Sequence, residues 1–95
     1  MYATVRRWAG AGPVEAVIQA SRRLTASLGG VPGFVTLVVL DAGEAGMVAV
    51  LVCEGQGDLA VADLLVGRWT AEHLAAPAAQ AADLATGEVI VQKGL

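Results

Sequence analysis

The chain has 95 residues, of which 56% are hydrophobic, and it carries a formal net charge of −3. A chain of this length is expected to form one domain, residues 1–95, and to bury only about 60 to 65% of the surface that its unfolded form exposes. Its 6 Lys and Arg residues do not provide the basic face that nucleic-acid binding needs. Acidic residues interrupt the apolar segments before they reach the about 20 residues of a membrane span. We therefore expect neither a nucleic-acid partner nor membrane insertion.

The cysteine content limits which covalent or metal cross-links can stabilise the fold. Cys53 is the single cysteine, so no disulfide within the chain is possible, and a lone thiol is typical of a reducing compartment. Residues 1–8 contain no apolar signal region, which predicts a cytoplasmic protein. One cysteine and one histidine do not suffice for a closed structural zinc site within one chain, so we expect no metal. A second subunit is the remaining support for so small a core.

The first predicted element is a strand over residues 2–8, which are rich in aromatic and β-branched side chains. Successive side chains of a strand point to opposite faces, so alternate residues share one face. The residues expected on one face are Tyr2, Thr4, Arg6 and Trp8. Arg7 then lies on the opposite face. One of these two arginines must therefore approach the interior of the sheet or its rim.

The first helix is predicted over residues 13–28. Pro13 suits its first turn, where the missing N–H of proline costs no hydrogen bond. Residues at three- and four-residue spacing give the helix one buried stripe. This stripe consists of Val14, Val17, Ser21, Leu24 and Leu28. Gly29 and Gly30 can supply a left-handed cap for the helix, and Pro32 prevents its continuation.

A β-hairpin is predicted next, with strands over residues 35–40 and 47–53 and a turn between them. A half-buried strand alternates apolar and polar residues, but these two strands are apolar on both faces. We expect one face of the first strand to present Phe34, Val38 and Leu40. We expect the other face to present Val35, Leu37 and Val39. Both faces of the sheet must therefore be covered.

The second helix is predicted from an N-cap at Asp58 to about Ala76, where Pro77 stops or kinks it. Its buried stripe is expected to consist of Leu59, Ala62, Val66, Trp69 and His73, with Leu65 at its border. The last predicted strand covers residues 88–93, where β-branched side chains cluster.

The resulting order of elements is βαββαβ. This order predicts an α+β, ferredoxin-like fold, in which a four-stranded antiparallel sheet carries both helices on one face. The other face stays apolar and uncovered, although covering each large aliphatic side chain is worth about 1.5 to 3 kcal/mol. We therefore predict a two-fold homodimer in which the sheets of two copies face each other.

Several segments together resemble one family. They are residues 2–7, 31–34, 41–43 and 87–89, together with the helical Trp69. The pattern is similar to the dimeric α/β-barrel superfamily, in particular antibiotic biosynthesis monooxygenase-like domains, over nearly the whole chain. The resemblance implies a homodimer whose two sheets form a barrel, with a pocket between sheet and helices in each subunit. Some members oxidise polycyclic phenols or quinols with molecular oxygen and no cofactor, and others degrade haem.

The chain departs from this family at a chemically important position. Active cofactor-free oxygenases of the group have an asparagine about one helical turn before the helical tryptophan, where this chain has Leu65. The haem-degrading relatives also use an asparagine on the first strand, but this chain contains no asparagine. This difference favours a non-catalytic ligand-binding module, or a structural dimerisation module, as the alternative to an enzyme.

The resemblance places a ligand-binding cavity near Trp69 and His73. Trp69 can stack an aromatic ligand, or it can simply fill the core. His73 is the candidate catalytic base because imidazole changes protonation near neutral pH; it could also ligate a haem iron, or lie at the helix end bonded to a backbone carbonyl.

Three further residues complete the predicted binding site, namely Leu65, Arg6 and Trp8. Arg6 or Arg7 would steady developing negative charge on a ligand, and the alternative is a side chain that snorkels at the strand end. Trp8 is expected to line either the pocket or the dimer seam. The predicted function is that of a monooxygenase-like oxidoreductase, working without a cofactor, that acts on or binds a small hydrophobic aromatic molecule of the phenol or quinol type.

Overall fold

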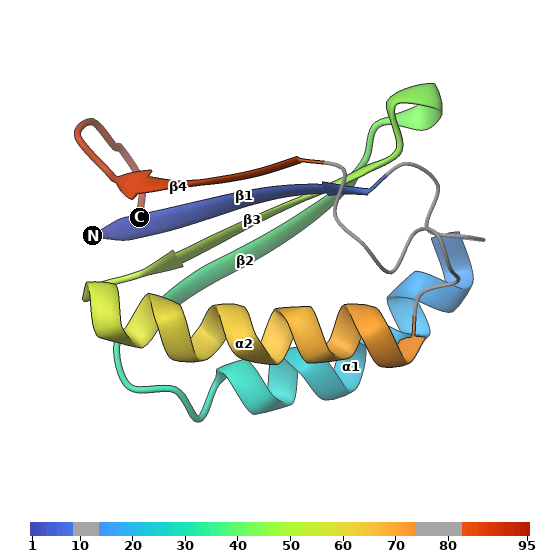
Figure 1. Cartoon of the computed structure of the whole chain (residues 1–95), viewed down its shortest axis with the longest axis horizontal. Helices are drawn as coiled ribbons and strands as arrows, with labels where there is room; N and C mark the ends of the chain where they lie inside the picture. The colour runs from blue at the N-terminus through green and yellow to red at the C-terminus, as the bar shows by residue number, and fades with distance from the viewer. Residues whose placement is uncertain (9–13, 74–82) are drawn as a thin grey trace.

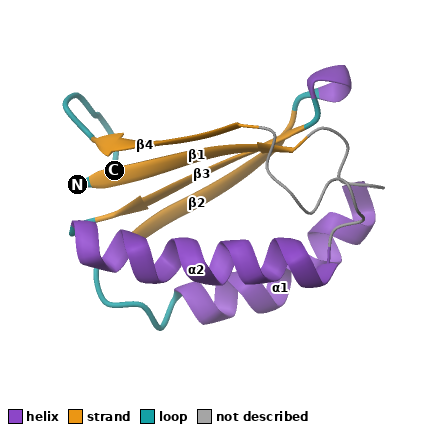
Figure 2. Ribbon diagram, viewed as in Figure 1, coloured by secondary structure: helices purple, strands orange, loops and turns teal. Residues whose placement is uncertain are grey.

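The computed structural model describes residues 1–8, 14–73 and 83–95. In chain order the elements are β1 (Tyr2–Trp8), α1 (Val14–Leu28), β2 (Phe34–Asp41), the short 3-10 helix η1 (Gly43–Ala45), β3 (Met47–Cys53), α2 (Gln56–His73) and β4 (Asp83–Glu88). The strands form one antiparallel sheet in the order β2-β3-β1-β4, and both helices lie on the same face of it (Figures 1 and 2). The predicted ferredoxin-like α+β architecture is confirmed.

Helix α1 follows the predicted apolar stripe. Val17, Leu24 and Leu28 are buried at the spacing that places them on one helical face. Val14, predicted in the same stripe, is 41% exposed at the start of the helix. Beyond Leu28, Gly29 N–H donates to the Thr25 carbonyl and Gly30 N–H to the Ser27 carbonyl, but neither glycine has a positive φ, so the prediction of a left-handed cap is wrong. Pro13 lies outside the described residues.

Helix α2 begins earlier than predicted. It starts at Gln56, so Asp58 lies within the first turn and the prediction that Asp58 is the N-cap is wrong. In that turn the carboxylate lies near the positive end of the helix dipole. It also packs against Gly33, which has φ +77° and where a Cβ atom would lie 2.2 Å from Asp58 Oδ2. Gly33 is therefore needed both for its backbone conformation and for the space it leaves to Asp58. The predicted helix end at Ala76 and Pro77 lies outside the described residues.

Strand β2 contains an irregularity that changes which side chains share a face. The pairing with β3 shifts between Phe34 and Thr36, which is the signature of a β-bulge. Phe34 consequently packs against the core, as Leu37 and Val39 do, whereas Val38 is 49% exposed on the other face. Grouping Phe34 with Val38 and Leu40 was wrong, because simple alternation does not anticipate an inserted residue.

The last strand lies earlier in the chain than the predicted 88–93. Strand β4 pairs with β1 from Tyr2↔Glu88 to Arg7↔Asp83, and Val89 N–H adds one bond of 2.8 Å to the Met1 carbonyl. Intrinsic strand preference favours the β-branched residues that follow Glu88, so pairing with the free edge of β1 has overridden local propensity here.

The two faces of the sheet differ in their environment. The core lies between the sheet and the helices, and its buried members include Trp8, Leu28, Ala49, Leu51, Cys53 and Trp69. The opposite face, called the outer face below, carries Val5, Val38, Leu40, Val48 and Val50, and no described helix covers it (Figure 1). Among the described residues, neither helix has the length and apolar character required to cross a membrane.

Candidate functional site: a groove between the two helices

A groove of about 280 Å³ runs between α1 and α2. We call it the helix groove, and its lining consists of Arg23, Leu24 and Ser27 from α1 and Leu65, Arg68, Trp69, Glu72 and His73 from α2. Three residues of the predicted site therefore meet here, namely Leu65, Trp69 and His73. They recur every four residues along α2, and side chains at this spacing lie one above another on a helix surface.

Trp69 connects the two helices at the base of the groove. Its indole Nε1–H donates to the Ala20 carbonyl of α1 over 3.0 Å, and the residue is 5% exposed. Its ring meets Trp8 edge to face, with centroids 6.4 Å apart and an interplanar angle of 72°. Trp69 thus packs in the core and lines the groove at the same time. Its N–H already has an acceptor, so the ring face rather than the N–H is what it can offer a ligand.

His73 lies one helical turn after Trp69, at the end of the described part of α2. The two ring centroids are 6.4 Å apart at an angle of 46°, and the histidine side chain is 34% exposed. His73 Nε2 lies 3.9 Å from Glu72 Oε2, which is too far for a hydrogen bond. An imidazole placed in this way can receive a proton from a molecule held in the groove.

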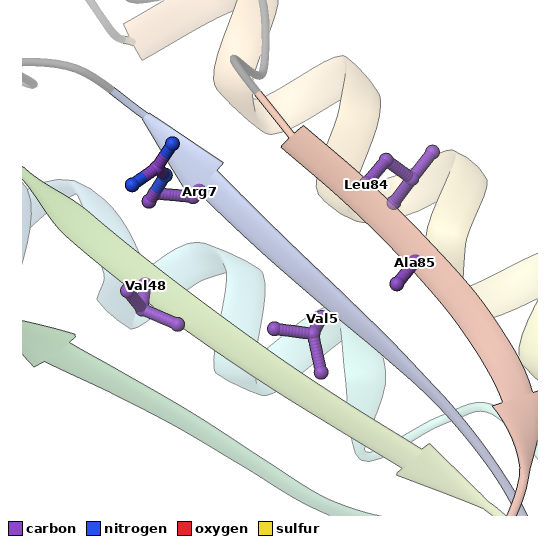
Figure 3. A pocket seen from close by; sticks show the side chains of 5 residues that line it. All are labelled: Val5, Arg7, Val48, Leu84 and Ala85. Atoms are coloured by element: carbon purple, nitrogen blue, oxygen red, sulfur yellow. The ribbon is translucent and has the colours of Figure 1, made fainter.

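Arg6 and Trp8, the other predicted ligand-binding residues, do not line the helix groove. They lie beneath the helices on the core side of β1, where Trp8 is 1% exposed. Arg6 Nη2 donates to Asp63 Oδ1 of α2 over 2.7 Å, and the Arg6 side chain is 12% exposed. Arg6 is therefore the arginine that enters the interior, while Arg7 lies on the outer face (Figure 3).

The interior near β1 contains two N–H donors with no hydrogen-bond partner. Among the buried side-chain atoms of the described residues, these are Arg6 Nε and Trp8 Nε1. A buried donor left without an acceptor costs about 1 to 3 kcal/mol, and most such groups in native proteins are paired with protein or ordered water. Both donors come from one face of β1, two residues apart.

Arg23, Arg68 and Glu72 were not predicted as site residues. Two guanidinium groups and one carboxylate line the groove beside His73, so it can accommodate a ligand that carries negative charge. Arg23 is not a member of the buried stripe predicted for its helix, and such a position indicates solvent exposure but not which neighbour the side chain faces. The two basic residues come from different helices. Their position at one groove depends on how the helices cross, which the sequence pattern does not show.

Cys53 is fully buried in the core at the end of β3. Burial raises the pKa of its thiol above the ordinary value, and the nearby negative charge of Asp58 raises it further. The thiolate is therefore disfavoured, which suits a packing residue and not a nucleophile. Within the described ranges no three His, Cys, Asp or Glu side chains gather closely enough to hold a metal ion.

The sheet order and the two helices on one face define the chain as a ferredoxin-like α+β protein. No family model matches its sequence, and no curated protein matches it either. Solved structures match nearly the whole chain. One is a candidate antibiotic biosynthesis monooxygenase from Nitrosomonas europaea, with a TM-score of 0.65 and 15% identity over 96% of this chain and 100% of the other.

Two further structures have the same architecture. The heme-degrading protein MhuD from Mycobacterium tuberculosis, solved with two hemes in its active site, has a TM-score of 0.60 and 23% identity over 99% of this chain and 100% of its own. The protein YjcS has a TM-score of 0.62 and 12% identity over 93% of this chain and 96% of its own. The chain therefore has the fold of the antibiotic biosynthesis monooxygenase-like proteins, and the resemblance seen in the sequence is confirmed at the level of the fold.

Proposed function

We propose that this protein is a cytoplasmic, monooxygenase-like oxidoreductase that holds a small aromatic molecule of the phenol or quinol type in the helix groove. The observation that carries the proposal is the meeting of the Trp69 and His73 rings in one groove of about 280 Å³ with basic side chains at its sides. Indole and imidazole rings contact flat aromatic ligands favourably, and Leu65 adds an apolar wall.

The proposed chemistry needs a base and a means of stabilising an anion. His73 takes the proton from the ligand hydroxyl. Arg23 and Arg68 stabilise the negative charge that develops on the ligand oxygen. Arg6, expected earlier to have this role, is already paired with Asp63. The electron-rich anion then reacts with molecular oxygen directly: one oxygen atom replaces a hydrogen on a ring carbon, the other leaves as water, and the ligand supplies all the electrons as it becomes the quinone, so the reaction uses no cofactor.

Haem fits this groove poorly. Pockets for drug-sized ligands span about 300 to 1,000 Å³, and the helix groove lies just below that range. A porphyrin is larger than the few rings that such a groove can enclose, so no step in the proposal involves haem.

The proposal includes a homodimer formed through the outer face. Val5, Val38 and Leu40 are 42%, 49% and 44% exposed there. Contiguous apolar surface of this kind is typical of an interface, and a two-fold arrangement covers the same patch on both copies.

A non-catalytic binding or dimerisation module is the second candidate. It is favoured by the hydrogen bond of Trp69 to Ala20, which gives this tryptophan a structural role, and by Leu65 in the position of the family asparagine. A binding module would use the same groove without turnover.

The test is oxygen consumption with an anthrone or quinol as the probe, together with quenching of tryptophan fluorescence on binding. We expect His73→Ala to reduce turnover by about 10²- to 10⁴-fold, because a positioned base typically contributes that much. Val61→Ala, on an exposed position of the same helix, is the matched control and should change nothing. Binding without oxygen uptake would select the non-catalytic module. Absence of binding would refute both versions of the site.

A further inference from the structure

The helix groove carries more positive charge than a neutral ligand balances. Arg23 of α1 and Arg68 of α2 each contribute a guanidinium group, and Glu72 contributes one carboxylate. With His73 counted as neutral, these three side chains leave the groove a formal charge of +1. The proton transfer proposed above does not change this total, because His73 gains one positive charge as the ligand gains one negative charge. One positive charge in the groove therefore stays without a counter-charge.

The chain itself offers the two groove arginines no counter-charge. Among the described residues, neither guanidinium group forms a hydrogen bond or an ion pair, although Glu72 follows Arg68 by one helical turn. Arg6 differs from them, because Asp63 holds its guanidinium group. The chain has 6 Lys and Arg residues and a net charge of −3, so two unpaired arginines at one groove concentrate positive charge there.

The walls of the groove strengthen the attraction between these arginines and an anion. Leu24, Leu65 and the ring of Trp69 make part of the lining apolar. Apolar walls lower the local dielectric constant and concentrate the field of nearby charges. A guanidinium group also matches a carboxylate in shape, since two of its N–H groups can donate to the two carboxylate oxygens.

The polar groups of the groove are spread along its length. α1 and α2 run in opposite directions (Figure 1), and the indole of Trp69 donates to the Ala20 carbonyl where they meet. Ser27 follows Arg23 by one helical turn, so its hydroxyl group lies toward the end of the groove away from His73. An elongated ligand can therefore present one polar group to the arginines and Ser27 and another to His73.

We propose that the ligand of the helix groove carries a permanent carboxylate besides its phenol or quinol hydroxyl group, which makes it an aromatic hydroxy acid. The inference rests on the function proposed above and specifies its substrate class. Arg23 and Arg68 hold the carboxylate from two helices. The ring lies against Trp69, and the hydroxyl group faces His73. A carboxylate brings the single negative charge that the groove lacks, whereas a phosphate ester brings about 1.5 to 2 and is repelled by Glu72.

Binding of two matched quinols tests the role of the acid group. The probes are gentisate, which is an anion at neutral pH, and gentisamide, which has the same ring and hydroxyl groups but no charge. In isothermal titration calorimetry at low salt, we expect gentisate to bind about tenfold more tightly, because hydrogen bonds between charged groups are the stronger ones. The difference should shrink at high salt, since salt screens exposed charges.

Arginine variants identify the groups that contact the carboxylate. Arg23→Gln and Arg68→Gln should each weaken gentisate binding by about three- to tenfold and change the affinity for gentisamide by less than about twofold. Both side chains are exposed, so the variants should keep the fold, which circular dichroism checks. Arg22→Gln is the matched control, because Arg22 is exposed on the same helix and does not line the groove. It should change neither affinity.

The outcomes separate this inference from the function on which it rests. Equal affinity for the two probes, or equal effects of Arg22→Gln and Arg23→Gln on gentisate binding, overturns the carboxylate contact. The groove then binds neutral phenols, and the function proposed above stands. Absence of binding by both quinols refutes the helix groove as a ligand site, and the function and the inference fall together.

Discussion

The same three strands present two very different surfaces. On the core side, Trp8, Ala49 and Leu51 are 1%, 3% and 2% exposed. On the outer face, Val5 and Val38, which belong to the same sheet, are 42% and 49% exposed. Both surfaces are apolar in sequence, so hydrophobicity alone does not distinguish them.

What distinguishes the two faces is that the helices cover the core side, whereas no described helix covers the outer face. The core side contains the Arg6–Asp63 ion pair and the hydrogen bond from Trp69 to Ala20, each of which joins one element to another. The first contact fixes α2 on the sheet and the second fixes α2 against α1, which apolar packing alone does less selectively. We propose that a second copy of the chain covers the outer face. The comparison therefore separates what folds the subunit from what we propose assembles it.

Truncation of one side chain on each face should show the difference between the two faces most clearly. We expect Leu51→Ala to lower the free energy of unfolding by about 2 to 5 kcal/mol, because it opens a cavity in a packed core. Val38→Ala should change it by less than about 0.5 kcal/mol in dilute protein, because little packing is lost at a half-exposed position. Urea unfolding followed by circular dichroism measures both variants.

Protein concentration then sharpens the comparison. If the outer face is covered by a second copy, dimerisation stabilises the folded chain by mass action. The cost of Val38→Ala should therefore grow as the concentration rises, while the cost of Leu51→Ala stays nearly constant. Equal behaviour of the two variants at all concentrations would contradict an interface on the outer face.

The ion pair between β1 and α2 is the next largest expected effect. Asp63→Ala leaves the Arg6 guanidinium, 12% exposed, without its partner, and should cost about 1 to 3 kcal/mol. Because Asp63 is 29% exposed, the expected cost in unfolding free energy is lower than for a fully buried ion pair.

A double variant shows whether the cost comes from the stranded charge. Arg6→Met combined with Asp63→Leu replaces the pair by apolar side chains and should recover most of the lost stability. Should the double variant remain as unstable as Asp63→Ala, the pair would be fixing the geometry of α2 on the sheet, not merely compensating a buried charge. Thermal unfolding of the wild type and of these two variants distinguishes the results.

The helices were the part of the fold most readily predicted from the sequence. Burial of Val17, Leu24 and Leu28 in α1 follows a helical period over 15 residues, so a shift of one residue does not erase the signal. Strands are shorter and have a period of two, so one inserted residue reverses the face of its neighbours. This is why the bulge next to Phe34 could not be seen in the pattern.

The position of β4 shows a different limit. Composition favours residues 88–93, yet Asp83–Glu88 occupies the edge of the sheet. The choice between neighbouring segments depends on the lengths of the preceding connection and of β1, which are tertiary quantities.

The residues of the candidate site also differ in how well the sequence predicts their positions. Leu65, Trp69 and His73 could be placed together because one helix brings them onto one side. Arg23 and Arg68 come from two helices, and their proximity to the groove depends on a crossing that no local pattern encodes. Arg6 and Trp8 share a strand face with each other, but the indole of Trp69 lies between Trp8 and the groove residue His73.

The two tryptophans provide the finest test, since they touch each other but differ in their hydrogen bonding. Trp69→Phe removes the N–H bonded to the Ala20 carbonyl, whereas Trp8→Phe removes an N–H that has no partner among the described residues. Both variants lose similar ring area, so the hydrogen-bond contribution should make Trp69→Phe the more destabilising by about 0.5 to 1.5 kcal/mol. Chemical denaturation of the two variants side by side measures the difference. A smaller loss for Trp69→Phe than for Trp8→Phe would mean that Trp8 Nε1 has an acceptor in solution, such as an ordered water, and that the unpaired donors near β1 are already satisfied.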